Sequence, residues 1–191
     1  MNLAVRKAMT LAEFLAWEER QPLKHEFDGF GPVAMSGGTL AHARIQRNLS
    51  TALSFRLRGK PCEFLGSDVK VRTKEDHIRY PDGLVTCTLG ENAARIAPDP
   101  VVIFKVLSPS TAGVDRIVKA REYQAMPSIQ RYVMIEQDRV GATVYSRSSE
   151  VWTHEILADG SVLVLPEIGV EVPLAELYEG VAFEAEPDAS S

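Results

Sequence analysis

Three features are scarce in this sequence of 191 residues: cysteine, long hydrophobic runs and an excess of positive charge. The two cysteines, Cys62 and Cys87, are not spaced as a zinc or redox motif, and two buried free thiols in a reducing cytosol are favoured over a disulfide. No segment approaches the ~18 apolar residues of a membrane span, and the N-terminus lacks the apolar core of a signal peptide. We therefore expect a soluble, cytoplasmic protein without membrane contact.

The net charge is −5 at pH 7, from 21 basic and 26 acidic residues. This balance argues against a general nucleic-acid binder, but it leaves room for a local basic patch. Hydrophobic residues make up 45% of the chain, which is enough for one core. We expect a single domain over residues 1–183 and a disordered tail over residues 184–191, where the chain is acidic, small and polar.

Local signals predict an alternation of helices and strands. Thr10 and Glu13 fit a capping box, and Asp28-Gly29 predicts a hairpin turn. The expected helices are Leu11–Arg20, Leu40–Arg58, Ala112–Ala125 and Pro173–Tyr178. The expected strands after the hairpin are Cys62–Leu65, Asp68–Arg72, Ile78–Thr88, Val101–Leu107, Ile129–Glu136, Thr143–Ser146, Val151–Ile156 and Ser161–Leu165. This order predicts an α/β (α+β) fold, a mixed sheet flanked by helices with a parallel strand–helix–strand unit and a C-terminal antiparallel meander.

The apolar run Val101–Leu107 is bounded by prolines and is typical of a strand buried on both faces, yet Lys105 lies in its middle. An unpaired buried ammonium group is costly, so this lysine must have a partner, reach water along its stem, or take part in chemistry. Asp82 in a neighbouring strand and Lys119 on the following helix could meet it on one face of the sheet.

The candidate residues also have ordinary structural interpretations. Asp82 lies in a Pro-Asp-Gly sequence, which is frequent in turns, and Lys119 could pair with Asp115 on a solvated helix face. Glu26 could be a solvated hairpin carboxylate, and His42 a helix cap or a surface group. The residue pattern by itself leaves both interpretations open.

A more specific pattern runs through most of the chain. Its segments are His25-Glu26, Gly37-Gly38-Thr39-Leu40-Ala41-His42, Tyr80-Pro81-Asp82, Phe104-Lys105-Val106-Leu107-Ser108-Pro109-Ser110-Thr111, Asp115-Arg116 with Lys119, and Tyr123. With these motifs, the chain from about Thr10 to Phe183 resembles the Uma-two family of restriction-endonuclease-like proteins, within the PD-(D/E)xK nuclease superfamily. The Ser-Pro-Ser-Thr stretch followed by Asp-Arg and Lys carries most of the specificity.

The resemblance implies a metal-dependent endonuclease that hydrolyses the phosphodiester bonds of DNA. Asp82 matches the metal-binding aspartate, Glu26 the acidic residue of the early hairpin, and Lys119 the lysine near the scissile phosphate. Together with Lys105, Asp82 and Lys119 are the candidate catalytic residues, and Asp82 and Glu26 the candidate metal ligands. Mg²⁺ or Mn²⁺ is the cofactor expected for the family, because carboxylates hold hard divalent ions that activate water beside a phosphate.

The resemblance also implies double-stranded DNA as the partner. The candidate nucleic-acid contacts are His42, Arg44, Arg47 and Arg116. A homodimer is one possible assembly, because a restriction-type nuclease must cut two strands.

The family pattern fails at two positions. Its second metal-binding carboxylate stands where this chain has Lys105, and the glutamate usually found after the hairpin stands where this chain has Phe30. Exchanging glutamate for lysine changes the local charge by two units and removes a ligand. We hypothesise that the Lys105 ammonium group takes the metal's place and pairs with Asp82 and also Glu26. Weak or absent Mg²⁺ binding and little cleavage are then expected.

Two other hypotheses stay open. In the first, the chain is a non-catalytic nucleic-acid- or protein-binding module that uses the arginine-bearing face of the helix Leu40–Arg58. In the second, Lys105 is a buried amine of lowered pKa that acts as a nucleophile.

Overall fold

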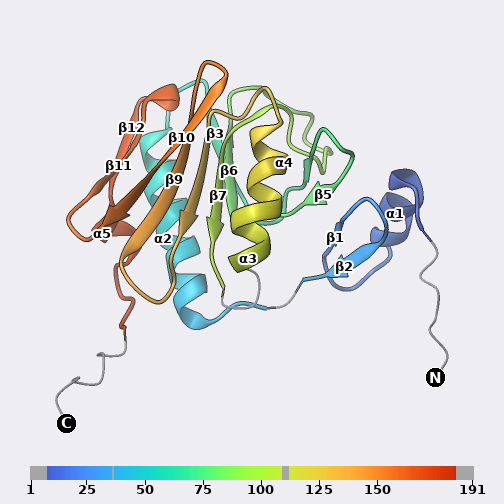
Figure 1. Ribbon diagram of the computed structural model, residues 1–191, viewed down its shortest axis with the longest axis horizontal. Helices are drawn as coiled ribbons and strands as arrows, with labels where there is room; N and C mark the ends of the chain where they lie inside the picture. The colour runs from blue at the N-terminus through green and yellow to red at the C-terminus, as the bar shows by residue number, and fades with distance from the viewer. Residues whose placement is uncertain (1–7, 36, 109–111, 184–191) are drawn as a thin grey trace, which may run out of the picture.

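The computed structural model describes residues 8–35, 37–108 and 112–183 (Figure 1). The tail expected over residues 184–191 and part of the Ser-Pro-Ser-Thr segment lie outside this range. Within the described residues, no helix is long and apolar enough to cross a membrane.

Helices and strands alternate much as the local signals predict. The helices are α1 (Leu11–Glu18), α2 (Leu40–Arg56), α3 (Ala112–Val114), the π-helix η1 (Asp115–Lys119), α4 (Ala120–Gln124), the 3₁₀ helix η2 (Pro166–Ile168) and α5 (Leu174–Leu177). The strands are β1 (His25–Phe27), β2 (Pro32–Ala34), β3 (Glu63–Gly66), β4 (Val71–Arg72), β5 (Ile78–Arg79), β6 (Gly83–Thr86), β7 (Pro100–Val106), β8 (Arg131–Ile135), β9 (Gly141–Ser148), β10 (Val151–Ala158), β11 (Val162–Leu165) and β12 (Val170–Pro173). The predicted mixed sheet flanked by helices is confirmed.

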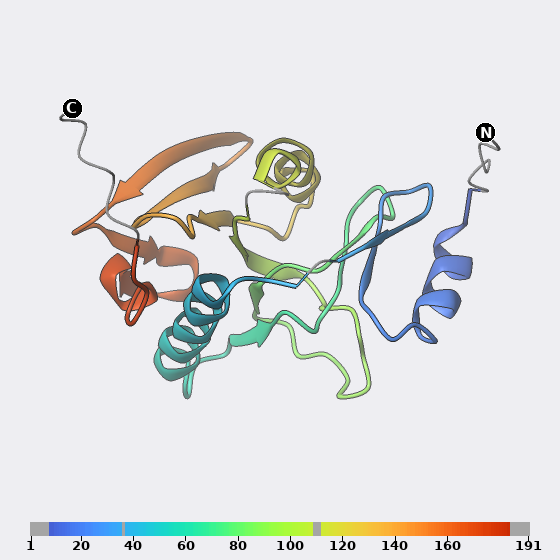
Figure 2. The same ribbon diagram turned by 90° about the horizontal axis from the view of Figure 1, so that it is seen from below.

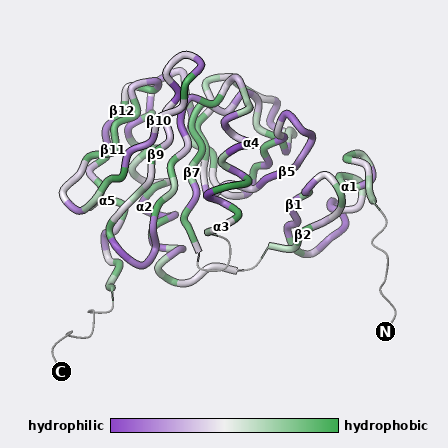
Figure 3. Tube along the Cα trace, in the orientation of Figure 1, coloured by the Kyte–Doolittle hydropathy of each residue, from purple (hydrophilic) through white to green (hydrophobic). Residues whose placement is uncertain are grey.

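A six-stranded sheet in the order β10-β9-β8-β7-β6-β3 forms the centre of the molecule. Strands β7 and β8 are parallel, as the strand–helix–strand pattern predicts, and the other neighbours are antiparallel. Hydrophobic stretches run along this sheet around β7 (Figure 3). Because β7 is central and carries alternating side chains to both faces, it is buried almost throughout.

Helices cover the two faces of the large sheet (Figure 2). On one face α2 and α5 pack with β11 and β12, and Val102, Phe104 and Val106 of β7 point into that core. On the other face Ala120 and Tyr123 of α4 pack against the strand residues Ile103 and Tyr132. Lys105 alternates with Phe104 and Val106, so it points toward the α4 face.

The N-terminal elements form a small lobe beside the sheet (Figure 1). A second sheet has the order β2-β1-β5-β4, in which β1 pairs with both β2 and β5, and β5 pairs with β4. The predicted capping box at Thr10 and Glu13 begins α1. Phe14 of α1 stacks on Phe27 of β1, with ring centroids 5.0 Å apart, and fixes the helix on the lobe.

The segment Ile78–Thr88 does not form the single strand that we expect from its composition. It divides at Pro81 and Asp82 into β5 and β6, which belong to different sheets. Proline cannot donate a ladder hydrogen bond, which favours a break at this point. Gly83 then begins β6, where a Cβ atom would come within 2.5 Å of the Phe64 ring, so this glycine serves close packing.

The C-terminal meander is shorter than the sequence predicts. Strands β8, β9 and β10 follow one another antiparallel in the large sheet, but β11 leaves it and pairs only with β12 in the described structure. The β11–β12 hairpin packs over the α2 face through Leu163, Leu165 and Val172. Burial of these alternating side chains accounts for the departure from the sheet.

The helix expected over Ala112–Ala125 is interrupted by the π-helix η1. Lys119 ends this segment, and Asp115 begins it. A π turn adds one residue to a helical repeat and often lies at a functional site. The hydrophobic spacing gives no signal for it.

The interpretation of Cys62 and Cys87 as buried free thiols is wrong. The two residues form a disulfide, and Cys87 is exposed. Their pairing follows from the register of β3 and β6, in which Glu63 lies opposite Thr86, so the next positions along are also opposite. The free-thiol argument for a reducing cytosol therefore no longer applies.

Candidate functional site

Asp82 is held at the start of β6 by backbone contacts to β7. Its N–H group donates to the carbonyl of Phe104 at 2.9 Å, and its Oδ2 accepts from the N–H group of Val106 at 2.7 Å. Because the break after β5 leaves Asp82 outside the regular ladder, its carboxylate can turn back onto the neighbouring strand. The alternative interpretation of Asp82 as an ordinary turn carboxylate does not account for these contacts or for the burial of the residue.

Lys105 reaches Asp82 from the middle of β7. Its Nζ atom lies 2.8 Å from Asp82 Oδ2, and its side chain is only 12% exposed. The predicted pairing of Lys105 with Asp82 is confirmed. The predicted pairing with Glu26 is not found within the described residues, where Glu26 pairs with Lys119 and Arg79. The lysine side chain is largely buried, and the carboxylate provides the partner that its burial requires.

Helix α2 supplies two further groups to Asp82. His42 Nε2 lies 3.3 Å from Asp82 Oδ1, and Gln46 Nε2 donates to the same oxygen at 2.6 Å. These residues are four apart and share one face of the helix. Thr39 caps α2 by accepting from the His42 N–H group, which orients the first turn. Sequence reasoning missed Gln46, although its i+4 spacing from His42 was a usable signal.

Lys119 belongs to a second buried ion cluster next to the first. Its Nζ atom lies 2.9 Å from Glu26 Oε2 and 3.0 Å from Asp115 Oδ1. Glu26 also accepts from the backbone N–H group of Tyr80 at 3.2 Å. The predicted i,i+4 pair with Asp115 is present, but it is buried and not on a solvated helix face.

The second cluster extends through residues that sequence reasoning missed. Arg79 Nη1 lies 3.5 Å from Glu26, and its Nε and Nη2 atoms donate to the two oxygens of Glu122 at 2.6 Å each. His77 Nδ1 lies 2.8 Å from Glu122 Oε1. Arg79 and Glu122 are far apart in sequence, and nothing in the local pattern pairs them.

One cavity of about 430 Å³ opens onto both clusters. Glu26, His42, Gln46, Asp82, Lys105 and Lys119 line its polar part. Val33, Ala34 and Met35 of the hairpin region line an apolar wall. Four of the predicted candidates, Glu26, Asp82, Lys105 and Lys119, thus come together with His42 in one place.

The three candidate arginines lie elsewhere. Arg44 and Arg47 are on the exposed face of α2, where Arg47 donates to Asn48 Oδ1 at 2.9 Å. Arg116 forms an ion pair with Glu136 beyond the carboxyl end of β8. None of them lines the cavity around Asp82.

Lys105 and Asp82 each stabilise the charged form of the other. Burial by itself raises the pKa of Asp82, but the hydrogen bond from His42 and the charge of Lys105 outweigh it and hold this pKa below its usual range. Burial lowers the pKa of Lys105, and the Asp82 carboxylate raises it by more. Lys105 is therefore protonated at neutral pH, which is opposite to what a nucleophilic amine requires.

The residues around Asp82 do not fit a divalent metal ion. Both carboxylate oxygens already accept contacts from Lys105, Gln46 and Val106. Over the ranges 8–35, 37–108 and 112–183, no group of three or more His, Cys, Asp or Glu residues is arranged to hold a metal. The Lys105 ammonium group lies 2.8 Å from Asp82 Oδ2, and its positive charge would repel a dication at that carboxylate.

The fold of this chain matches that of a solved crystal structure. The crystal structure of a protein from Anabaena variabilis, titled a "putative nuclease belonging to DUF820", matches with a TM-score of 0.71. The match covers 91% of this chain and 99% of that one at 17% identity, so it establishes the fold alone.

The chain belongs to the Uma2 family, whose description is "Putative restriction endonuclease" and whose model matches residues 11–175. The resemblance found in the sequence is thereby confirmed. Two relatives from Synechocystis sp. are uncharacterized protein slr1290 and uncharacterized protein sll1609. The first is 33% identical over 174 residues, covering 90% of this chain and 92% of the relative. The second is 31% identical over 141 residues, covering 72% and 80%.

Proposed function

We propose that this protein is a DNA endonuclease by descent, and that Lys105 closes its phosphodiesterase site. The observation that carries the proposal is the 2.8 Å ion pair between Lys105 and Asp82. Members of the nuclease superfamily that the chain resembles use this aspartate to bind a metal. Here the Lys105 ammonium group forms an ion pair with that carboxylate, so metal-dependent cleavage should be weak or absent.

The charge balance of five residues in the two clusters supports the proposal, since Arg79 and Glu122 of the second cluster carry opposite charges that cancel. Asp82, Glu26 and Asp115 carry three negative charges, and Lys105 and Lys119 carry two positive charges, which leaves 2 − 3 = −1. A glutamate at position 105 would give four carboxylates and one ammonium group, which leaves 1 − 4 = −3. A site of charge −3 attracts a dication far more strongly than a site of charge −1.

The proposed partner is double-stranded DNA. His42 in the cavity and Arg44 and Arg47 on the outer face of α2 could contact successive phosphates, and Arg116 could contact the backbone beyond β8. Cutting both strands would require two copies of the chain. We propose the cytoplasm as the place of action, because DNA is the substrate.

A paired cleavage assay tests the proposal. Supercoiled plasmid is incubated with Mg²⁺ or Mn²⁺ and either the unchanged protein or the Lys105→Glu variant. We expect cleavage by the variant only, and its loss again in the double variant Lys105→Glu/Asp82→Asn. Cleavage by the unchanged protein that requires Asp82 would show that Lys105 does not close the site.

A second function, a nucleic-acid-binding module without catalysis, is favoured by the closed site together with exposed Arg44 and Arg47. It predicts DNA binding with a steep salt dependence and no cleavage by either form of residue 105. Changing Arg44 and Arg47 to alanine should lower the slope of log affinity against log salt by about 2. Changing the exposed Lys74 and Arg121 to alanine removes the same charge and should leave the slope unaltered.

A further inference from the structure

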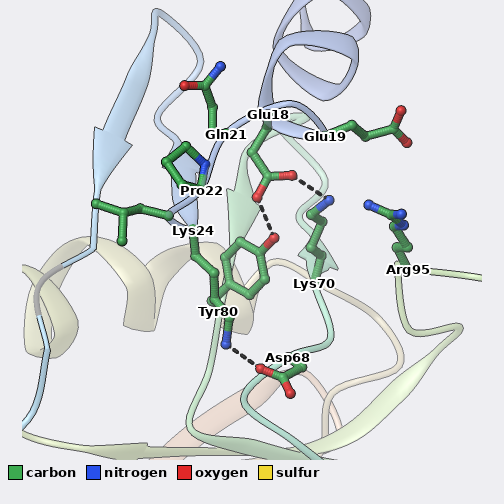
Figure 4. A pocket seen from close by; sticks show the side chains of 10 residues that line it. Glu18, Glu19, Gln21, Pro22, Lys24, Asp68, Lys70, Tyr80 and Arg95 are labelled. Carbon is green, nitrogen blue, oxygen red and sulfur yellow. Dashed lines mark hydrogen bonds and ion pairs between the residues drawn. The ribbon is translucent and has the colours of Figure 1, made fainter.

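A second cavity lies beside Tyr80, whose hydroxyl group donates to Glu18. It has a volume of about 310 Å³ and is lined by Lys24, Lys70, Arg95, Glu18 and Tyr80 among others (Figure 4). Three cationic side chains line this small space, together with the carboxylates of Glu18, Glu19 and Asp68. The resemblance to nucleases assigns no role to any of them.

The backbone holds two of these cations side by side. Lys70 forms a parallel bridge with Ile96, its N–H group donates to the Arg95 carbonyl at 3.0 Å, and its own carbonyl accepts from Ala97 at 2.8 Å. Figure 4 shows the ends of the Lys70 and Arg95 side chains directed toward one another. Like charges repel, so a convergence of this kind is favourable when an anion lies between them.

Two of the acidic residues of the cavity are already engaged. Glu18 Oε2 lies 2.7 Å from Lys70 Nζ, and its Oε1 accepts from the Tyr80 hydroxyl at 2.7 Å. Burial raises the pKa of Glu18, but the hydrogen bonds from Lys70 and Tyr80 outweigh it and lower this pKa overall. Asp68 is paired with Lys24. Glu19 also lines the cavity, and no ion pair of its carboxylate is found within the described residues.

Hydrogen-bond donors remain for an anion. A lysine ammonium group has three donors, and Lys70 uses one of them on Glu18. Arg95 is exposed, and within the described residues its guanidinium group has no acidic partner. Its planar donors match the oxygens of a phosphate group. We infer that this cavity is a phosphate-binding site, formed by Arg95, Lys70 and Lys24.

The position of the cavity connects it to the nuclease-like site. Leu23 and Lys24 line both cavities, and Lys24 Nζ also donates to the Ser67 carbonyl at 3.0 Å. Tyr80 is two residues before Asp82. A DNA strand that reaches Asp82 and Lys119 could therefore place a neighbouring phosphate beside Arg95. This part of the inference rests on the proposed function, whereas binding of free phosphate does not.

The test measures binding of a short labelled DNA duplex over a range of salt concentrations. Arg95→Gln is the test variant because Arg95 is exposed, and Lys74→Gln is the control because Lys74 is also exposed but outside the cavity. Removing one phosphate contact should lower the slope of log affinity against log salt by about 0.9. We expect this loss for Arg95→Gln and no loss for Lys74→Gln.

A second measurement separates DNA phosphate from free phosphate. Inorganic phosphate is added to the unchanged protein and to Arg95→Gln, and the melting temperature is recorded. A rise in melting temperature that is absent in Arg95→Gln supports a site for free phosphate, provided that the slope of log DNA affinity against log salt is the same in both proteins. Equal behaviour of Arg95→Gln and the unchanged protein in both measurements would overturn the inference, as would an equal loss of DNA affinity in Lys74→Gln. If the unchanged protein binds no duplex, the proposed DNA function fails, and the phosphate measurement alone decides the cavity.

Discussion

The ion pair between Lys105 and Asp82 decides the chemistry of the main cavity at the scale of single residues. Two opposite charges are buried there together, and either one alone would be costly. Asp82 is further held by His42, Gln46 and the Val106 N–H group, whereas Lys105 has Asp82 as its close partner in the described structure. Removing the Asp82 carboxylate alone should therefore lower the free energy of unfolding more than removing both charges.

The first prediction concerns this asymmetry. Asp82→Asn should lower the free energy of unfolding by about 3–5 kcal/mol, because it leaves a buried ammonium group unpaired. The double variant Asp82→Asn/Lys105→Met should regain at least about 1 kcal/mol of that loss. Asp76→Asn, which alters the exposed pair of Asp76 with Arg72, should cost under about 1 kcal/mol. Urea unfolding measures all four proteins, and a double variant no more stable than Asp82→Asn would contradict the account.

The second prediction concerns acid. The pKa values of Asp82, Glu18 and Glu122 all lie below their usual range, because cationic or hydroxyl partners outweigh the effect of burial. Each carboxylate therefore stabilises the fold above its unfolded-state pKa, and this contribution is lost as the pH falls through the lower folded-state value. Unfolding free energy should be nearly constant near neutral pH and should fall below about pH 4. A free energy of unfolding that stays constant between pH 6 and pH 3 would contradict this prediction.

At the scale of elements, sequence patterns predict the helices, turns and strand pairs that local interactions determine. The capping box of α1, the Asp28-Gly29 hairpin, the long α2 and the parallel β7–β8 pair all follow from such signals. The π turn of η1 does not, because tertiary contacts of Lys119 stabilise it. Pro81 favours the break between β5 and β6, but the two strands' separate sheets depend on tertiary contacts such as that of Asp82 with Val106. The same holds for the disulfide, which depends on the register of β3 and β6.

The third prediction concerns that disulfide. It closes a loop with a sequence separation of 25 between Cys62 and Cys87. Restricting the unfolded chain over such a loop contributes about 3 kcal/mol to stability. The Cys62→Ser/Cys87→Ser variant should lose about this amount relative to the oxidised protein in urea unfolding. Reductant should lower the stability of the unchanged protein and leave that of the variant unaltered; equal stability of oxidised protein and variant would contradict the prediction.

At the scale of the whole molecule, the candidate site joins parts that are distant in sequence. Glu26 comes from the N-terminal lobe, His42 from α2, Asp82 and Lys105 from the large sheet, and Lys119 from η1. The family pattern identified these five positions without any coordinates. It could not identify Arg79 and Glu122, because their ion pair exists only once β5 and α4 are brought together. The predicted nucleic-acid contacts Arg44 and Arg47 lie on the outer face of α2, outside the cavity, and their role stays a prediction.

The most direct test of the account is a calorimetric titration with Mg²⁺ and Mn²⁺, which needs no catalytic activity. It compares the unchanged protein, Lys105→Glu, and the control Lys105→Glu/Asp82→Asn. We predict no saturable binding to the unchanged protein, binding to Lys105→Glu, and loss of that binding in the double variant. Saturable binding to the unchanged protein that disappears in Asp82→Asn would contradict the claim that the Lys105 ammonium group stands in the metal's place.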